Sequence, residues 1–348
     1  MEPYCRIYMS GAKGKTVVAR APGRVNLIGD HTDYTGGLVL PMAIDRYTTV
    51  AGQALDGAIR LTSEQLHEPL VLNLPVADAA NVMPTWGRYV AGVANQMGCA
   101  VGIEGSVTTT IPIGAGLSSS AALEVATALA LGSTLSVTEL AQLCRRAEHV
   151  ATGVPCGIMD QLTSAAGVDG HALLIDCHTL DIEPIALPNN MQVVVQWVAA
   201  RTLVGSAYAD RVAQCAQAEK EIGPLRLASV ADTNQIADAV VRARALHVVS
   251  ENERVRQAAK CLQAGDVQGF GLLMNESHES LRSNFAVSTE QMDDAVKQAQ
   301  ALPGVYGARM TGGGFGGCMV MVADSDARLP ENDNTWRVRA VGGAAIIS

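Results

Sequence analysis

The feature that most constrains the fold is a glycine- and serine-rich loop that leads into a long, almost wholly apolar segment. Residues 112–121 read PIGAGLSSSA, and the segment that continues to residue 132 is dominated by Ala, Leu and Val. A helix that is apolar on all sides is stable only where other elements cover it on all sides. The sequence therefore predicts a buried helix over residues 118–132, following a strand rich in Thr and Val at residues 106–111.

The loop itself has the chemistry of a polyphosphate site. Gly114 and Gly116 allow the backbone to approach a ligand closely. Ser118, Ser119 and Ser120 fall at the N-cap and in the first turn, where unpaired backbone N–H groups and the helix dipole favour an anion. An ordinary serine-capped core helix is the alternative. Three consecutive serines exceed what capping requires, so we interpret the loop as a phosphate site.

Composition excludes several classes of protein. The 348 residues are 48% hydrophobic and 17% charged, which suits one large or two ordinary domains with a sizeable core. A net charge of −9 argues against nucleic acid or an acidic membrane as a partner. No apolar run approaches the ~18–20 residues that span a bilayer, and no signal peptide is evident. The eight cysteines form no CxxC pair, so we expect reduced thiols in a cytoplasmic protein.

Strand-like and helix-like segments alternate, which predicts an α/β or α+β protein in two lobes. Capping boxes predict helix starts at Ser136, Ser250 and Ser288, the first helix ending at Gly153. We place the lobe boundary near Pro184. The remaining expectations are strands at 16–20, 38–43, 47–52, 171–177, 191–198 and 336–341, a short helix at 160–166, and a glycine-rich turn with a strand at 312–322.

Two further glycine-rich stretches do not fit the nucleotide motifs that they resemble. Residues 11–16, GAKGKT, have two residues between the glycines where a P-loop has four, and they lead into a strand-like run. Residues 312–317 satisfy G-x-G-x-x-G but precede a strand, whereas a dinucleotide fingerprint follows one. We interpret the first stretch as a basic turn and the second as a tight turn.

Residues 23–37 place Asp30, His31, Thr32, Asp33 and Tyr34 between glycines, just after Arg24. From the residues alone, this cluster is consistent with a metal site, acid–base chemistry, a site for a polyhydroxylated ligand or a polar turn.

Several motifs together resemble the galactokinases, a family of the GHMP small-molecule kinases. The matching stretches are GRVNLIGDHTDY at 23–34, the loop at 112–121, CGIMDQ at 156–161, RTLVGSAY at 201–208 and RMTGGGFGGC at 309–318. They are colinear and span about residues 19–322. The resemblance implies transfer of the ATP γ-phosphoryl group to the 1-hydroxyl of α-D-galactose, with Mg²⁺ as the metal.

The resemblance also implies the fold. We expect an α+β protein with an N-terminal lobe like domain 2 of ribosomal protein S5 over residues 1–183. A ferredoxin-like C-terminal lobe would cover residues 184–348, with the active site in the cleft. We further expect small-molecule partners only, and a monomer or weak dimer.

By resemblance, Asp160 is the catalytic aspartate and Arg24 stabilises charge between donor and acceptor. From spacing alone, Asp160 would be a helix N-cap, Arg24 a surface turn residue and Glu148 a solvated helix residue. Trp86 and Tyr89 are candidates for the adenine pocket or for core packing. The remaining implied residues are Asp30, His31, Thr32, Asp33, Gly157 and Tyr208 for the sugar, Ser63, Gly114, Ala115, Gly116, Leu117, Ser118, Ser119 and Ser120 for the nucleotide, and Ser120 and Glu148 for Mg²⁺.

The sequence departs from the family pattern at some positions. Asp30 stands where the family has Glu, residues 196–200 are mostly apolar where it has a polar run, and Ala207 replaces a common Glu. Because the side chain of Asp30 is shorter than that of Glu, a second function stays possible: that of a related kinase acting on a galactose-like sugar such as L-arabinose. A third alternative is a non-catalytic sensor of galactose and ATP. Such relatives tend to have an altered phosphate loop, whereas residues 114–122 keep the family pattern here, so this alternative is disfavoured.

Overall fold

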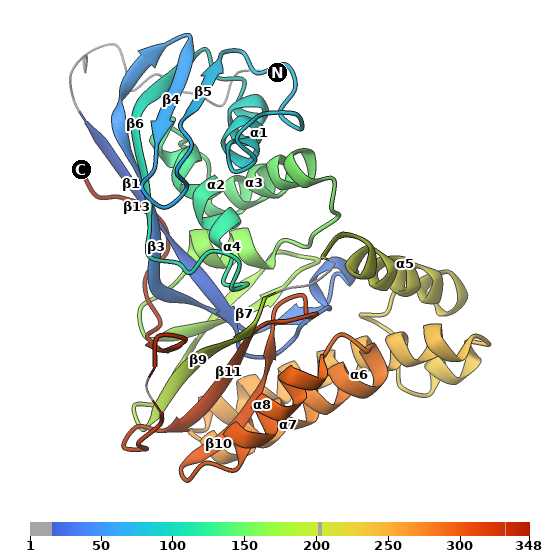
Figure 1. Ribbon diagram of the computed structural model, residues 1–348. Helices are drawn as coiled ribbons and strands as arrows, with labels where there is room; N and C mark the ends of the chain where they lie inside the picture. Colours follow the sequence, from blue (N-terminus) through green and yellow to red (C-terminus); the bar gives the residue numbers. More distant parts are fainter. Residues whose placement is uncertain (1–15, 201–203, 331) are drawn as a thin grey trace.

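The computed structural model describes residues 16–200, 204–330 and 332–348, with the side chains of 204–206 left out. The turn expected at 11–15 and the first residues of the 201–208 motif lie outside the described residues. The described chain forms two lobes, one above the other in Figure 1. The expected two-lobed α+β architecture is confirmed.

The first lobe is built on a six-stranded sheet with the order β13-β1-β3-β6-β4-β5. All neighbouring strands are antiparallel except β4 and β6, which are parallel. The last residues of the chain return to this lobe, because β13 pairs with β1. The strands are β1 (Val17–Asn26), β3 (Pro41–Asp56), β4 (Ala58–Thr62), β5 (Leu70–Asn73), β6 (Val101–Thr109) and β13 (Ala345–Ile346).

Helices cover one face of this sheet (Figure 1). The central one, α2, is buried along residues 121–128 and packs against β1, β3 and the other three helices, as its apolar sequence predicts. The capping box at Ser136 and the end at Gly153 are also confirmed, at the two ends of α3. The helices are α1 (Gly87–Met97), α2 (Ser119–Ala130), α3 (Val137–Thr152) and α4 (Met159–Ala166).

A three-stranded sheet with the order β2-β7-β8 follows. It consists of β2 (Leu38–Val39), β7 (His171–Asp176) and β8 (Ile182–Ala186). The expected boundary between residues 183 and 184 falls within β8 and stays a prediction.

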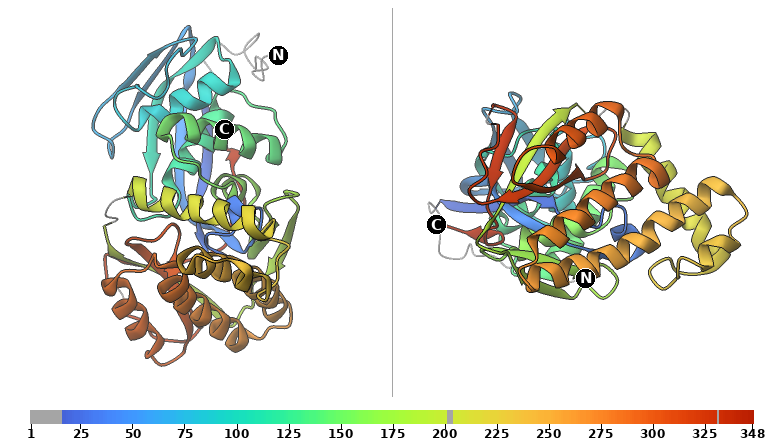
Figure 2. Two further views of the ribbon diagram at one scale, coloured as in Figure 1. Left: turned by 90° about the vertical axis from the view of Figure 1, so that its right-hand side faces the viewer. Right: turned by 90° about the horizontal axis from the view of Figure 1, so that it is seen from below.

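The second lobe has an antiparallel sheet with the order β10-β11-β9-β12. Figure 2 shows the helices of this lobe side by side, and α7 and α8 pack against β10. The described residues between β11 and β12 contain no helix. The elements are β9 (Met191–Ala199), α5 (Val204–Ile222), α6 (Ala239–Gln263), α7 (Val267–Ser280), α8 (Glu290–Gln300), β10 (Val305–Thr311), β11 (Gly317–Asp324) and β12 (Thr335–Val338), with short helical turns at Asp33–Thr35, Asp232–Gln235 and Leu281–Phe285.

Two expected helix starts are wrong. Ser250 lies inside α6, which begins after Asp238, and its hydroxyl donates to the Leu246 carbonyl of the preceding turn. The cap of α8 is Thr289, while Ser288 donates instead to Asp293. The pattern of a serine followed three residues later by Glu or Gln therefore does not distinguish the start of a helix from its interior. No helix in the described residues is long and apolar enough to cross a membrane.

Candidate active site

A cavity of about 650 Å³ is lined by residues of both lobes. In the first lobe the lining residues come from β1 and the loop after it, from the loop before α2, and from α1, α3, α4 and the loop between α3 and α4. In the second lobe they come from the end of β9, from α5 and from the loop after β10. Residues from five separate sequence motifs thus meet at one cavity. The residues expected at the site that line it are Arg24, Asp30, His31, Asp33, Gly114, Gly116, Ser118, Ser119, Ser120, Glu148, Gly157, Asp160 and Tyr208.

Asp160 lies in the first turn of α4 and is held from two sides. Arg24, which is buried on β1, places its Nε 2.7 Å and its Nη2 2.6 Å from Asp160 Oδ1. Ser118 donates to Asp160 Oδ2 at 2.5 Å. The remaining Arg24 nitrogen, Nη1, donates to the Gly116 carbonyl at 2.8 Å. Arg24 therefore fixes both the aspartate and the loop that leads into α2, and it is no surface turn residue.

We call residues 112–120 the serine loop. Gly114 and Gly116 have φ values of 77° and 82°, which favour glycine. Ser118 is the N-cap of α2 in a left-handed conformation, but its hydroxyl contacts Asp160 instead of capping the helix. Because no side chain caps the first turn, its backbone N–H groups remain for a ligand. Ala115 and Leu117 are buried in the core and do not line the cavity.

Glu148 faces the serine loop from α3. Its Oε1 accepts from Ser120 at 3.0 Å, and its Oε2 accepts from Gln161 at 2.5 Å. The same Gln161 nitrogen donates to Glu124 on α2 at 3.1 Å. Burial, together with the charge of Asp160, raises the pKa of Glu148, and burial with the charge of Glu148 raises the pKa of Glu124. Glu124 and Gln161 were not among the residues expected at the site from the sequence.

The loop of residues 29–38 carries the charged cluster after β1. Burial and the charge of Asp160 raise the pKa of Asp33 to about 7. Gly157 lies directly against the Asp33 carboxylate, so a Cβ at that position would clash with it. Thr32 does not line the cavity; its hydroxyl contacts the carbonyls of Gly29 and Leu38 and so closes the loop.

The rings of His31 and Tyr208 line the cavity, and those of Phe285 and Tyr34 pack against them from outside the lining. The His31 ring lies 4.5 Å from the ring of Phe285 and 5.7 Å from that of Tyr208, between ring centroids. The hydroxyl of Tyr34 is 3.1 Å from His31 Nδ1. Phe285 belongs to the π-helical turn after α7 and was not expected from the sequence.

Other expected residues lie elsewhere. Ser63 follows β4, away from the cavity lining, and its hydroxyl donates to Gln65. Trp86 is also absent from the lining and donates to the Glu68 carbonyl, whereas Tyr89 does line the cavity. Among the described residues, no group of three or more His, Cys, Asp or Glu side chains is placed to hold a metal.

Comparisons with known proteins agree with this geometry. The family model "Galactokinase galactose-binding signature" matches residues 6–54, and the models of the N-terminal and C-terminal domains of GHMP kinases match residues 87–168 and 258–331. The galactokinase of Homo sapiens is 42% identical over 91% of this chain and 86% of its own length. That of Roseiflexus sp. (strain RS-1) is 43% identical, over 88% and 83%.

Solved structures give the same result. The crystal structure of Lactococcus lactis galactokinase complexed with galactose has a TM-score of 0.85 at 29% identity, covering 97% of this chain and 96% of that one. The mevalonate kinase of Methanococcus jannaschii has a TM-score of 0.68 at 20% identity, over 95% of this chain and all of the other, and shares the fold.

Proposed function

The chain belongs to the galactokinase family of GHMP kinases, and on this premise we propose that its cavity transfers the γ-phosphoryl group of ATP to the 1-hydroxyl of α-D-galactose. The products are galactose 1-phosphate and ADP. The observation that carries this proposal is the contact of Asp160 with both Arg24 and Ser118, in the cavity that the serine loop and the 29–38 loop both line.

The serine loop is assigned to the phosphates of ATP. Its glycines, its serine hydroxyls and the free N–H groups of the first turn of α2 supply donors without a cluster of cations. This explains how a chain with a net charge of −9 binds a polyphosphate. For Ala115 and Leu117, whose side chains are buried, backbone atoms are the groups available to the nucleotide. Ser63 lies outside the cavity, which does not support its assignment to the nucleotide.

Asp160 is assigned as the group that accepts or orients the proton of the 1-hydroxyl. Phosphoryl transfer needs alignment and stabilisation of charge more than covalent help from the protein. The contacts with Arg24 and Ser118 hold the Asp160 carboxylate in one orientation. A group that takes a proton from the acceptor hydroxyl needs such a fixed orientation. Among the described residues that line the cavity, Arg24 is the one arginine or lysine, so it is assigned to stabilise the negative charge between donor and acceptor.

Mg²⁺ is assigned to Ser120 and Glu148. Mg²⁺ binds few protein oxygens and keeps waters and phosphates, so one hydroxyl and one carboxylate fit its needs. The contacts of Glu148 with Ser120, Gln161 and Cys156 are all with uncharged groups, and burial and the negative charge of Asp160 raise its pKa. A cation at this position would offset that excess of negative charge. When bound, Mg²⁺ neutralises phosphate charge.

Galactose is assigned to the 29–38 loop and its neighbours, with Asp30, His31, Asp33, Gly157 and Tyr208 lining that part of the cavity. A site with fixed hydrogen-bond groups discriminates against a sugar that leaves them unpaired. Thr32 supports the loop through its contacts with two backbone carbonyls.

We also propose that the chain works in the cytoplasm as a monomer or weak dimer, without nucleic-acid or membrane partners, and that its lobes divide near residue 183. The net charge supports the absence of such partners. Cysteines such as Cys144, Cys177 and Cys215 are thiols, as in a reducing compartment.

Product analysis tests the function. The protein is incubated with ATP, Mg²⁺ and galactose, and the products are examined by phosphorus and proton NMR. We expect ADP and a sugar phosphorylated at C1 as the α-anomer. ATP that is not consumed, or a phosphate at another hydroxyl, would contradict the proposal.

A further inference from the structure

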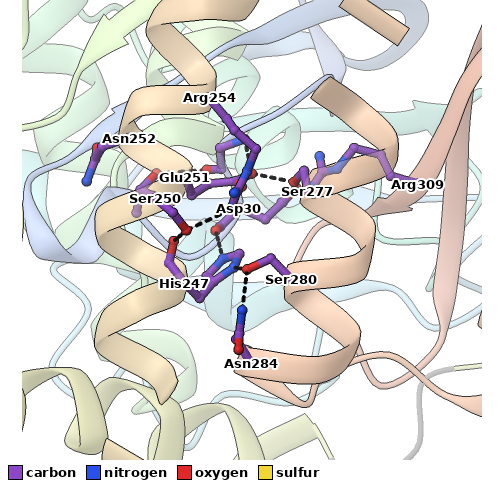
Figure 3. Close-up of polar contacts among 12 residues, drawn as sticks. Asp30, His247, Ser250, Glu251, Asn252, Arg254, Ser277, Ser280, Asn284 and Arg309 are labelled. Carbon is purple, nitrogen blue, oxygen red and sulfur yellow. Dashed lines mark hydrogen bonds and ion pairs between the residues drawn. The ribbon is translucent and has the colours of Figure 1, made fainter. Parts of the chain in front are cut away.

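One face of α6 contacts the 29–38 loop from outside the cavity. His247, Glu251 and Asn252 are buried side chains on this face. Each one contacts a backbone group of the loop: the Asp30 carbonyl, the Gly29 N–H and the Leu38 N–H, respectively. Figure 3 shows His247 and Glu251 extending from α6 towards Asp30, with Ser277 and Ser280 beside them on α7. None of these α6 residues lines the cavity.

The loop needs such external support. Gly29 and His31, on either side of Asp30, have φ values of 99° and 66°. A left-handed conformation is uncommon for residues other than glycine, although histidine adopts it more readily than most, and it is maintained by the surrounding structure. The hydrogen bond from His247 to the Asp30 carbonyl is made to the peptide group that directly precedes His31.

The hydrogen bonds of His247 determine its tautomer. Nε2 lies 3.1 Å from the Asp30 carbonyl oxygen, which only accepts, so Nε2 carries the proton. Nδ1 then accepts from the Ser280 hydroxyl at 2.9 Å, and that hydroxyl accepts in turn from Asn284 at 3.2 Å. Burial lowers the pKa of His247 to about 4, so the ring is neutral at physiological pH.

Glu251 and Asn252 hold the two ends of the loop. Glu251 Oε1 accepts from the Gly29 N–H at 3.0 Å and from Ser277 at 2.5 Å, and Arg254 pairs with its Oε2 at 2.8 Å. Although burial opposes ionisation, Arg254 lowers the pKa of Glu251 to about 2. Asn252 accepts from the Leu38 N–H at 2.7 Å.

A ring contact adds a second link from His247 to the cavity. The Phe285 ring lies 4.7 Å from the His247 ring and 4.5 Å from the His31 ring, between centroids. His247 therefore acts on both the backbone before His31 and, through Phe285, the His31 ring.

We propose that His247, together with Glu251, is a positioning residue for sugar binding: it holds the Gly29–His31 turn so that Asp30, His31 and Asp33 present a fixed set of groups to galactose. This inference rests on the proposed function of the cavity. In the described part of the chain, His247 contacts the 29–38 loop, α7 and Phe285 and not the serine loop, so its effect falls on the sugar and not on ATP.

Two variants of His247 test the proposal. His247→Leu keeps an apolar side chain of comparable bulk but removes the donor to the Asp30 carbonyl. His247→Gln keeps an N–H donor at about the position of Nε2. We expect His247→Leu to raise the KM for galactose about tenfold, the effect of one lost buried hydrogen bond. The KM for ATP should stay unchanged, and His247→Gln should restore most of the sugar affinity.

Glu253→Gln is the matched control, because this side chain lies on the exposed face of α6. It should leave both KM values unchanged. Equal changes in both KM values for His247→Leu, an unchanged KM for galactose, or failure of His247→Gln to restore it would overturn the proposal. If His247→Leu does not fold, Ser280→Ala removes the hydroxyl that donates to His247 Nδ1 and helps to orient the ring, and it should raise the same KM selectively.

Hydrogen exchange tests the positioning role of His247 independently of the proposed function. Exchange of residues 27–38, measured without substrates, should be faster in His247→Leu than in the wild type and in His247→Gln. Faster exchange in a protein that does not phosphorylate galactose would contradict the function but not the positioning role. Unchanged exchange in an active galactokinase would contradict the positioning role alone.

Discussion

Arg309 on β10 and Asp30 in the 29–38 loop form an ion pair 2.5 Å long, with both side chains almost completely buried. The other Asp30 oxygen accepts from the Gly312 N–H at 2.9 Å. Asp30 thus ties the second lobe to the cavity wall, and both of its carboxylate oxygens have protein partners. A hydrogen bond between galactose and Asp30 therefore has to be made to a carboxylate that already binds Arg309 and the Gly312 N–H.

Arg309→Met should strongly destabilise the protein, because it leaves a buried carboxylate without its cation. We expect a loss of about 3–5 kcal/mol in the free energy of unfolding, measured by urea denaturation. The double variant Asp30→Asn/Arg309→Met should recover part of it. Arg60→Met, which breaks the exposed pair with Glu104, is the control and should cost less than about 1 kcal/mol. Equal losses for both arginines would contradict the account.

Asp160→Asn should lower kcat by about 10²–10⁴-fold, the usual contribution of a positioned acid or base. The Kd of ATP, measured by calorimetry, should change little, because we assign the contacts with the phosphates to the serine loop. Asp181→Asn, at an exposed position, is the control. An unchanged kcat in Asp160→Asn would remove Asp160 from the mechanism.

Asp33 should make stability depend on pH in the absence of substrates. Its folded-state pKa of about 7 lies above its ordinary value of 3.8, so the folded protein binds more protons than the unfolded chain between these values. Stability therefore falls as pH rises from about 4 to 7. Asp33→Asn removes this dependence, so its Tm advantage over the wild type should grow between pH 5 and pH 8. A constant difference would show that the carboxylate is not perturbed.

Glu148→Gln and Ser120→Ala should increase the Mg²⁺ concentration that gives half-maximal rate. Binding of Mn²⁺, followed by electron paramagnetic resonance in the presence of ATP, should weaken in parallel. Removing the metal with a chelator should stop turnover in every variant. If Glu148→Gln has the same metal requirement as the wild type, Glu148 is not a ligand.

The sequence predicted the parts of the structure that depend on local pattern. The buried α2 helix follows from its apolar residues, and the ends of α3 follow from Ser136 and Gly153. The pattern at Ser250 was misleading, because a serine that bonds to its own helix has the same spacing as a cap. Ser63 and Thr32 were expected at the site by resemblance, but neither lines the cavity.

The parts that the sequence did not reveal depend on contacts between distant residues. His247 and Asp30 are separated by 217 positions, and Gln161 and Glu124 by 37. On a helix, a buried histidine or glutamate has the same local pattern as a solvated one. Only the packing of α6 against the 29–38 loop, and of α4 against α2, brings these side chains into contact with residues of the site.

The most direct test of the account compares kcat/KM for galactose and L-arabinose, with ATP and Mg²⁺, in the wild-type protein. L-Arabinose has the same ring hydroxyl arrangement but lacks the C6 hydroxymethyl group, and the shorter side chain of Asp30 is the sequence feature that favours it. The account predicts a clear preference for galactose. A preference for L-arabinose, or no ATP consumption with either sugar, would contradict it.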